Sequence, residues 1–247
     1  MSIKHPRELE QLKAIGAIVG RTLNKLTVLV KPGVSTAELN GLCMRMLEQE
    51  GALSSPPRAY NFPGAICISV NEEAIHGIPG GYVIQAGDLV KLDLTAEKDG
   101  FIADAAISVN VPPARPVAVT LAACAESAFR NALKVVRPGR RISDIGRAVE
   151  AEVNRQGFSV IRGLCGHGVG RAIHEDPQIP NFFDPLASGE LTEGLVFTIE
   201  PIISAGNGKA RLERDGWTIR TVDSSLAAHY EHTIVVTRNE PILLTAM

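Results

Sequence analysis

Two amphipathic helices open the chain. From about Glu8 to Leu29, apolar residues recur every three or four positions, which is the spacing of one buried helix face. Pro32-Gly33 ends this helix, because proline and glycine interrupt helical backbone. Either hydroxyl residue at 35–36 can cap a second helix, whose apolar positions keep the same spacing until Gly51 stops it. The pattern therefore predicts a helix, a tight break and another helix.

The same order returns in the second half of the chain. Helical spacing covers residues 118–136 and resumes over 143–157, with a Pro-Gly break between the two segments. Equivalent features of the two halves, such as Pro32 and Pro138, lie 106 residues apart. The match covers both helices and the break without a gap, which indicates a repeated structural unit.

Strands extend this repeat. A carboxylate stands six residues after a glycine in both 87–93 and 194–200, and each segment is otherwise apolar. We therefore expect a single domain of residues 1–247 with an α+β fold, in which helices flank antiparallel sheets. Its related halves should be about residues 1–112 and 113–247. Acids at equivalent strand positions would then meet near a pseudo-twofold axis.

A β-hairpin is predicted between Gly87 and Val109. Two β-rich runs flank the Asp99-Gly100 turn, a dipeptide typical of two-residue hairpin loops. Because this turn lies midway between Asp93 and Asp104, we expect the two carboxylates to lie nearly opposite each other. Like charges in that position destabilise a sheet, whereas a cation between them would be stabilising. For an isolated hairpin, two solvated surface acids are the simpler interpretation.

The remaining segments predict shorter elements. Residues 54–63 are rich in proline and serine and are expected to form a loop, followed by a short strand over 65–70. Residues 204–216 are typical of a polar turn. A closing strand is predicted over 226–237, with a Tyr-Glu-His sequence at its centre.

Composition and charge narrow the class of protein. The chain has 247 residues, of which 45% are hydrophobic and 21% charged, and its net charge is −2. This balance gives no electrostatic reason to expect nucleic-acid or membrane binding, and no apolar run approaches the ~20 residues of a membrane span. The polar opening residues show no secretory signal. Four cysteines without Cys-X-X-Cys spacing suit a reducing compartment, so we expect a cytoplasmic protein.

Acidic residues interrupt several apolar strands, where an unpaired charge is costly. These acids, together with one glycine-flanked histidine, are Asp93, Asp104, His167, Glu200 and Glu231. Repulsion among four carboxylates needs two or more positive charges to offset it. One imidazole with four carboxylates suits a pair of divalent ions such as Co, Mn, Fe, Zn or Ni. Two ions ~3.5–4 Å apart can activate a bridging water, as in metal-dependent aminopeptidases and related hydrolases.

Two further histidines lie beside glycine and proline turns. His76 precedes Gly-Ile-Pro and His174 precedes Glu-Asp-Pro, on segments that lead into the ligand strands. Each could be a structural histidine, or could hydrogen-bond a substrate carbonyl or shuttle a proton. His229 has a weaker case, and strand alternation turns His232 away from Glu231.

With these motifs in place, the sequence resembles the type I methionine aminopeptidases of bacteria, which lack a long N-terminal extension. The resemblance spans essentially the whole chain in order. The motifs that carry it are Val30–Thr36, Cys67–Glu72, His76–Pro79, Asp93, Asp104, Gly166–Gly170, His174-Glu175, Thr198–Pro201, Asp215–Trp217 and Tyr230–Thr233. It implies a pita-bread fold with pseudo-twofold symmetry, which agrees with the 106-residue offset.

The resemblance also implies roles for individual residues. The dinuclear metal site would be formed by Asp93, Asp104, His167, Glu200 and Glu231. Asp104 and Glu231 would bridge both ions, and Glu200 would help to activate the attacking water as a general base. His76 and His174 would contact the substrate near the scissile peptide, with His174 placed to stabilise the developing oxyanion.

The implied reaction is hydrolytic removal of the initiator methionine from nascent proteins and peptides whose second residue is small. The expected partners are therefore nascent polypeptides at the ribosome, and we expect a monomer without nucleic-acid or membrane contacts. An apolar pocket suits the unbranched thioether, and the residues that match the pocket of relatives are Tyr60, Phe62, Cys67 and Trp217. Departures from the family pattern, which bear on the tightness of this pocket, are Ala59, Ile75 and Ile173.

Two other functions remain open at this point. An Xaa-Pro dipeptidase or creatinase-like hydrolase would share the fold, but such enzymes usually carry a large additional N-terminal domain. Here the first predicted helix begins within about ten residues of the start. A binding module without catalysis would have lost ligands, whereas all five ligand positions are filled.

Overall fold

The computed structural model describes residues 1–246 and is built around one curved antiparallel sheet. The strands of this sheet are β1 (Leu53–Ser54), β2 (Cys67–Val70), β4 (Leu89–Lys98), β5 (Phe101–Asn110), β7 (Cys165–Gly168), β8 (Glu175–Pro180), β9 (Val196–Ile199), β14 (Glu231–Val235) and β15 (Ile242–Leu243). Its hydrogen-bonded path runs β1-β4-β5-β14-β9-β7-β8, with β2 beside β4 and β15 beside β14. The path places strands from both halves of the chain side by side.

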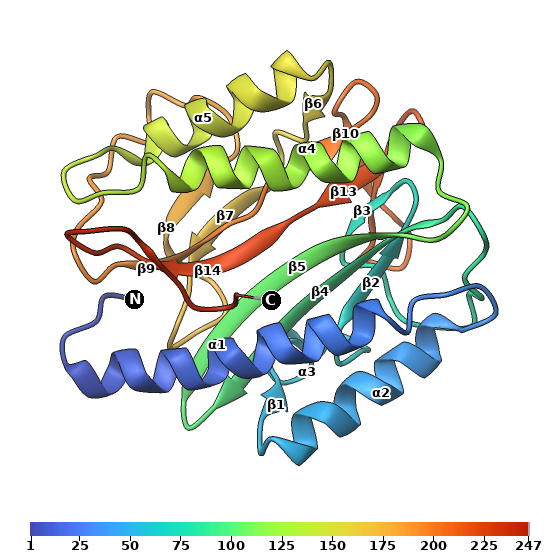
Figure 1. Ribbon diagram of the computed structural model, residues 1–247, viewed down its shortest axis with the longest axis horizontal. Helices are drawn as coiled ribbons and strands as arrows, with labels where there is room; N and C mark the ends of the chain where they lie inside the picture. The colour runs from blue at the N-terminus through green and yellow to red at the C-terminus, as the bar shows by residue number, and fades with distance from the viewer. Residues whose placement is uncertain (247) are drawn as a thin grey trace.

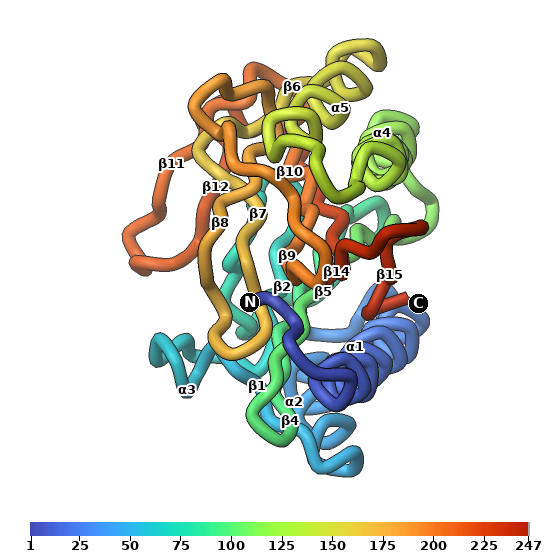
Figure 2. Tube along the Cα trace, turned by 90° about the vertical axis from the view of Figure 1, so that its left-hand side faces the viewer, coloured from blue at the N-terminus to red at the C-terminus, as the bar shows by residue number. Residues whose placement is uncertain are grey.

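Two small sheets and the helices complete the fold. One small sheet contains β6 (Ser159–Val160), β10 (Ile202–Ser204) and β13 (Ala227–His229), and the other contains β3 (Glu73–Ile75), β11 (Ala210–Leu212) and β12 (Ile219–Thr221). The helices are α1 (Pro6–Thr27), α2 (Thr36–Gln49), α3 (Pro56–Tyr60), α4 (Pro116–Leu133) and α5 (Ile142–Arg155). Figure 2 places α1 and α4 on one side of the sheet, and β11, β12 and α3 on the opposite side. None of the helices in residues 1–246 has the length and apolar composition that crossing a membrane requires.

The predicted repeat is present in the helices. Helix α2 spans 36–49 and α5 spans 142–155, so that both ends are shifted by 106 residues. Helices α1 and α4 end at Thr27 and Leu133, which is the same offset. In Figure 1 the pair α1 and α2 lies along the lower edge of the molecule, and the pair α4 and α5 lies along the upper edge. The expectation of two related halves with flanking helices is therefore confirmed.

Each helix pair covers its own hydrophobic core. Leu12 and Leu23 of α1 pack in one cluster with Leu92 of β4. Leu121 of α4 packs in a second cluster with Phe197 of β9. All five side chains are fully buried. Since each buried leucine or phenylalanine contributes about 1.5–3 kcal/mol, these faces hold the helices against one surface of the sheet and leave the other surface free for a site.

The β4–β5 hairpin forms as predicted, but its register differs by two residues from the expected one. Asp93 pairs with Ala106, whereas Asp104 pairs with Thr95. The turn determines this register, because Asp99 and Gly100 both have positive φ, as a two-residue type I′ turn requires. The two carboxylates are therefore diagonal neighbours on one face rather than directly opposite.

Three local predictions were wrong or incomplete. The expected loop over 54–63 contains α3, because its two prolines fit the first turn of a helix. The expected polar turn over 204–216 contains β11. The expected closing strand over 226–237 is divided at Tyr230 into β13, which pairs with β10, and β14, which pairs with β5 and β9. Pairing with different sheets forces the chain to bend at this residue.

Candidate metal centre

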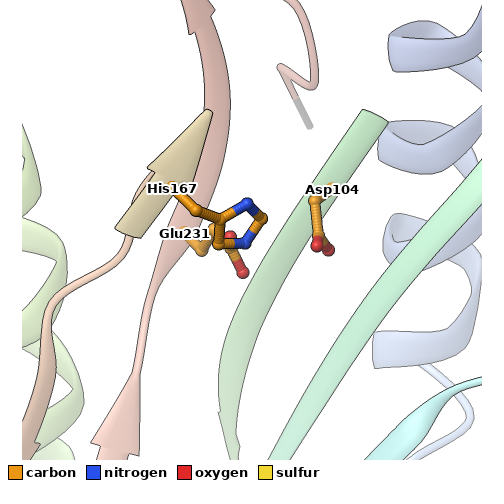
Figure 3. A group of neighbouring side chains, drawn as sticks. All are labelled: Asp104, His167 and Glu231. Atoms are coloured by element: carbon orange, nitrogen blue, oxygen red, sulfur yellow. The ribbon is translucent and has the colours of Figure 1, made fainter. Parts of the chain in front are cut away.

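Neighbouring strands bring together the five predicted ligands, which are far apart in the sequence. They are Asp93 on β4, Asp104 on β5, Glu231 on β14, Glu200 directly after β9, and His167 on β7. The five strands are consecutive in the central sheet. Figure 3 shows the side chains of Asp104, His167 and Glu231 directed toward one another from their strands. One ligand atom from each of these three lies within 4.8 Å of the others.

The glycines around His167 explain how its strand comes so close. A Cβ atom on Gly166 would collide with the backbone carbonyl of Thr198, and one on Gly168 would collide with that of Asp176. Only glycine therefore lets β7 pack tightly between β8 and β9. This packing brings His167 Nε2 to 3.5 Å from Glu200 Oε1.

Burial and mutual repulsion dominate the electrostatics of the carboxylates. Removal from water, reinforced by the neighbouring carboxylates, raises the pKa values of Asp93 and Glu231 well above their usual range. Burial also raises the pKa of Asp104, and it raises the pKa of Glu200 to about 8. A protein without bound cations thus favours protonated acids here. Divalent cations would reverse this balance by pairing with the ionised forms.

Threonine hydroxyls hold some of the carboxylate oxygens, whereas other carboxylate oxygens have no partner. Thr95 Oγ1 donates to Asp104 Oδ2 at 2.8 Å, and Thr198 Oγ1 donates to Glu200 Oε1 at 2.8 Å. Within residues 1–246, Asp104 Oδ1 and Glu231 Oε1 are buried and have no hydrogen-bond partner. Buried oxygens without a partner destabilise the folded protein unless a bound ligand pairs with them. The donor set therefore fits hard-to-borderline divalent cations.

Two histidines, His76 and His174, line the same cavity as the carboxylates. His174 Nδ1 lies 2.7 Å from Tyr60 Oη, and the His174 ring meets the His167 ring edge-on at a centroid distance of 4.2 Å. Burial lowers the pKa of His174 and lowers that of His76 to about 4. Both imidazoles are therefore uncharged near neutral pH, and each can donate one hydrogen bond from one ring nitrogen and accept another at the other nitrogen.

All predicted site residues line one cavity of about 880 Å³. The acids and His167 are joined there by the predicted substrate contacts, which are Tyr60, Phe62, Cys67, His76, His174 and Trp217. Phe62 and Trp217 meet edge to face at 5.3 Å. Burial raises the pKa of the Cys67 thiol well above its usual range, so this side chain is a neutral apolar surface and not a thiolate. Of the three departures from the family pattern, Ile75 and Ile173 reach the cavity wall.

His229, for which the sequence indicated only a weak case, lies beside two of the predicted ligands. Its Nε2 lies 3.4 Å from Glu231 Oε2 and 3.9 Å from Glu200 Oε2. A signal was available, since residues 229 and 231 are two apart and share a face of any continuous strand. His232 behaves as expected, because it points to the opposite face, where it lies 2.9 Å from Thr245 Oγ1.

A buried lysine was also missed. Lys91 is 1% exposed, and its Nζ donates to the backbone carbonyls of Asn71 and Leu89 at 2.8 and 3.3 Å. Burial lowers the pKa of this ammonium to about 7. Lys91 therefore ties β4 to the turn between β2 and β3, beside the centre rather than within it.

Comparison with known proteins decides the family. The family model described as metallopeptidase family M24 matches residues 10–238. The chain belongs to this family. This M24 peptidase is 42% identical over 249 residues to methionine aminopeptidase 2 of Bacillus subtilis (strain 168), with 100% of each chain covered. It also superposes on the crystal structure of methionine aminopeptidase from Thermotoga maritima with a TM-score of 0.96 and 35% identity, again over 100% of each chain.

A more distant likeness concerns the fold alone. Prolidase from Pyrococcus furiosus matches the M24 peptidase with a TM-score of 0.78 and 21% identity, over 99% of this chain and 65% of that one. The expected pita-bread fold is thus confirmed. The expected class, a metal-dependent aminopeptidase, is confirmed by the family and by the full-length relatives.

Proposed function

We propose that this M24 peptidase removes the N-terminal methionine from new polypeptides whose second residue is small, and that its buried acids and His167 would hold two divalent cations that supply an activated water. One observation carries the proposal: four carboxylates and one imidazole from five adjacent strands converge at a cavity and leave buried oxygens unsatisfied. The full-length relatives named methionine aminopeptidase support the substrate class.

The residues that would hold the cations are Asp93, Asp104, His167, Glu200 and Glu231. Asp104 and Glu231 come from adjacent strands within the set, so each would hold cations together with ligands from the strands on either side. When bound, the cations supply an acidified water near neutral pH and a Lewis acid for the substrate carbonyl. Their charge also returns the buried carboxylates to the ionised state.

Glu200 is the proton carrier in this proposal. Its Oε1 accepts a hydrogen bond from the Thr198 hydroxyl, and its backbone carbonyl accepts one from Asn181 Nδ2 at 2.8 Å. Both the side chain and the backbone of Glu200 are therefore held in place. Its carboxylate would take the proton of the attacking water as the new C–O bond forms. It would return this proton to the departing amine as the C–N bond breaks.

His174 and His76 would orient the peptide. The neutral His174 ring, held through Nδ1 by Tyr60, leaves its Nε2 free to donate to the carbonyl oxygen as negative charge develops. His76 has a left-handed φ of 58°, a costly conformation for a residue other than glycine, which places its ring in the cavity wall. The His76 ring would form one hydrogen bond with the substrate backbone, as donor or as acceptor.

The apolar part of the cavity would receive the methionine side chain. This part of the cavity is uncharged and is lined by Phe62, Trp217 and the neutral Cys67 thiol. Such a surface suits a thioether, which packs well against aromatic rings. Tyr60 is half exposed and lies at the entrance. Because Ile75 and Ile173 contribute branched side chains to the wall, we expect the pocket to accept methionine but to reject larger side chains.

The setting of the reaction follows from its substrate. We propose that the chain works as a single, monomeric catalytic domain in the cytoplasm, on nascent polypeptides at the ribosome. All four cysteines are free in the described part of the chain, which suits a reducing compartment. The net charge of −2 gives no electrostatic reason for nucleic-acid contact.

The proposal is tested with three peptides and controlled metal. Metal-depleted protein should not hydrolyse Met-Ala-Ser, and added Co(II) or Mn(II) should restore hydrolysis. Met-Ala-Ser should be cleaved at least ~10-fold faster than Met-Leu-Ser, because the second residue must be small. An Xaa-Pro dipeptide serves as the substrate of the rival enzyme with the same fold. Preferred cleavage of that dipeptide would overturn the proposal. So would the absence of Met-Ala-Ser cleavage with each of Co(II), Mn(II), Fe(II), Zn(II) and Ni(II).

A further inference from the structure

His229 lies beside the carboxylates with no ordinary partner for its ring. The residue is 1% exposed, and neither ring nitrogen has a hydrogen-bond partner within residues 1–246. Its backbone is held firmly, because Ser108 Oγ donates to the His229 carbonyl at 2.9 Å and accepts from the His229 amide at 3.0 Å. A fixed, buried and unsatisfied imidazole is expensive, so the site needs an occupant that uses it.

A nearby histidine shows what a structural imidazole looks like in this protein. Both ring nitrogens of His232 have partners, with Thr245 Oγ1 at 2.9 Å from Nδ1 and Tyr230 Oη at 3.1 Å from Nε2. His229 is three residues away and makes neither kind of contact. Its ring faces the cavity and not the helices.

The distances around His229 fit a shared cation better than a hydrogen bond. Its Nε2 lies 3.4 Å from Glu231 Oε2 and 3.9 Å from Glu200 Oε2, beyond the ~2.7–3.2 Å of an N–H···O bond. Two ligands bound to one ion at ~2.0–2.1 Å lie roughly 3–3.5 Å apart. A small movement of the Glu200 side chain would bring Glu200 Oε2 to the same distance from His229 Nε2.

Two triads of ligand atoms therefore share one carboxylate. Asp104, His167 and Glu231 form the first, and Glu200, His229 and Glu231 form the second. Each triad is buried and contains one imidazole. We propose that His229 Nε2 is a sixth protein ligand of the centre, so that each triad provides one nitrogen to a bound cation.

This inference rests on the proposed function, because it assumes that the centre binds divalent cations. A second nitrogen ligand shifts the preference of the centre toward Co, Ni, Fe and Zn and away from Mn, since imidazole favours the later ions. The loss of His229 should therefore weaken binding of Co(II) much more than binding of Mn(II).

The decisive experiment counts the imidazoles bound to metal. Metal-depleted full-length protein with ¹⁵N-labelled histidine is loaded with ¹¹³Cd(II), and the histidine rings that show ¹¹³Cd–¹⁵N coupling are counted by NMR. We expect two coupled rings in the wild type, one in His229→Gln and one in His167→Gln. The same His229→Gln protein should bind Co(II) ~10–100-fold more weakly at one position.

His174→Gln is the matched control, because His174 lines the same cavity without being a ligand in this proposal. It should retain both coupled rings. A single coupled ring in the wild type, lost in His167→Gln, would overturn the role of His229 and leave the proposed function intact. Failure of the wild type to bind Cd(II) at all would overturn both. If His229→Gln fails to fold, the ring that stays coupled in His167→Gln decides the question.

Discussion

At the scale of single residues, the centre is defined by polar atoms that the protein itself leaves unsatisfied. Asp104 Oδ1 and Glu231 Oε1 have no partner among the described residues, although Thr95 and Thr198 satisfy neighbouring oxygens. Folding rarely tolerates such atoms unless a ligand compensates for them. The cost of metal-free folding and the affinity for cations thus have one origin.

Replacement of Glu231 by glutamine should separate stability from activity. In metal-free protein, burial raises the pKa of Glu231, so that this acid must take up a proton on folding near neutral pH, and glutamine avoids that cost. The substitution also removes the carboxylate shared by both triads. We expect hydrolysis of Met-Ala-Ser to fall by at least ~10³-fold, while the metal-free variant becomes more stable than the wild type by about 1 kcal/mol or more. Urea unfolding in chelator and peptide assays measure the two effects. A metal-free variant less stable than wild type would contradict this account.

Removal of the His174 imidazole should reduce turnover rather than metal content. We expect His174→Ala to lower kcat by ~10²–10³-fold, as loss of an oxyanion donor does, with unchanged cation stoichiometry by elemental analysis. Tyr60→Phe should lower kcat less, because it removes only the hydroxyl that orients the ring. The effects should not add in the double variant, since Tyr60 acts through His174. Additive losses would show independent roles.

At the scale of elements, turns and breaks decide which side chains meet. The two-residue turn at Asp99-Gly100 sets the register of β4 and β5, and hence the diagonal placement of Asp93 and Asp104. The bend at Tyr230 moves the chain from one sheet to another while His229 and Glu231 stay on the same side. Neither feature follows from the hydrophobic pattern alone.

Helices α4 and α5 are joined by a buried carboxylate that should respond to acid. Glu152 is 6% exposed, and it accepts from Ser127 Oγ at 2.6 Å and from Arg155 Nε at 2.9 Å. The hydrogen bonds from Arg155, followed by those from Ser127, lower its pKa to about 2 from an ordinary 4.5. Because the folded protein favours the ionised form, this stabilisation is complete above pH 4.5 and is lost as the pH falls toward 2.

Glu152→Gln should therefore destabilise the protein in a pH-dependent way. We expect a loss of about 1–2 kcal/mol at pH 7 that shrinks as the pH approaches 2, as measured by urea unfolding of metal-free protein. Glu126→Gln is the control, because it removes an exposed ion pair with Arg130 and should change stability by under ~0.5 kcal/mol. A loss for Glu152→Gln that stays constant down to pH 2 would refute the assigned linkage.

At the scale of the whole molecule, the centre joins the two halves. Asp93 and Asp104 come from the first half, whereas His167, Glu200 and Glu231 come from the second. The halves meet where β5 pairs with β14, next to the triads. A cation held by ligands from both sides would therefore oppose separation of the halves as well as unfolding of either one.

Metal removal should thus lower global stability. Cations at about 100 times their dissociation constant stabilise the folded state by about 2.7 kcal/mol per site. For a chain of this size one such site corresponds to roughly 5–10 °C in Tm, so we expect EDTA to lower Tm by at least that much and to increase amide exchange in β5 and β14 most. Calorimetry and hydrogen exchange measure these changes. An unchanged Tm after verified metal removal would show that the centre does not join the halves.

The local pattern determined much of this protein. Helical spacing, capping hydroxyls and Pro-Gly breaks depend on neighbouring residues, so the helix pairs, their 106-residue repeat and the β4–β5 hairpin could be predicted from sequence. The acids could be singled out because a charge within an apolar strand is costly wherever that strand lies. The resemblance to methionine aminopeptidases then predicted the pita-bread fold and the roles of individual residues.

Only the tertiary structure decided which of these groups come within reach of one another. The strand order β4-β5-β14-β9-β7 is a long-range choice made by core packing, and no local signal encodes it. The two-residue spacing indicates that His229 and Glu231 share a side, but the distance between their side chains depends on the bend between two sheets. Distances between ligand atoms arise from such non-local pairing, and that is why the residues were predictable while their geometry was not.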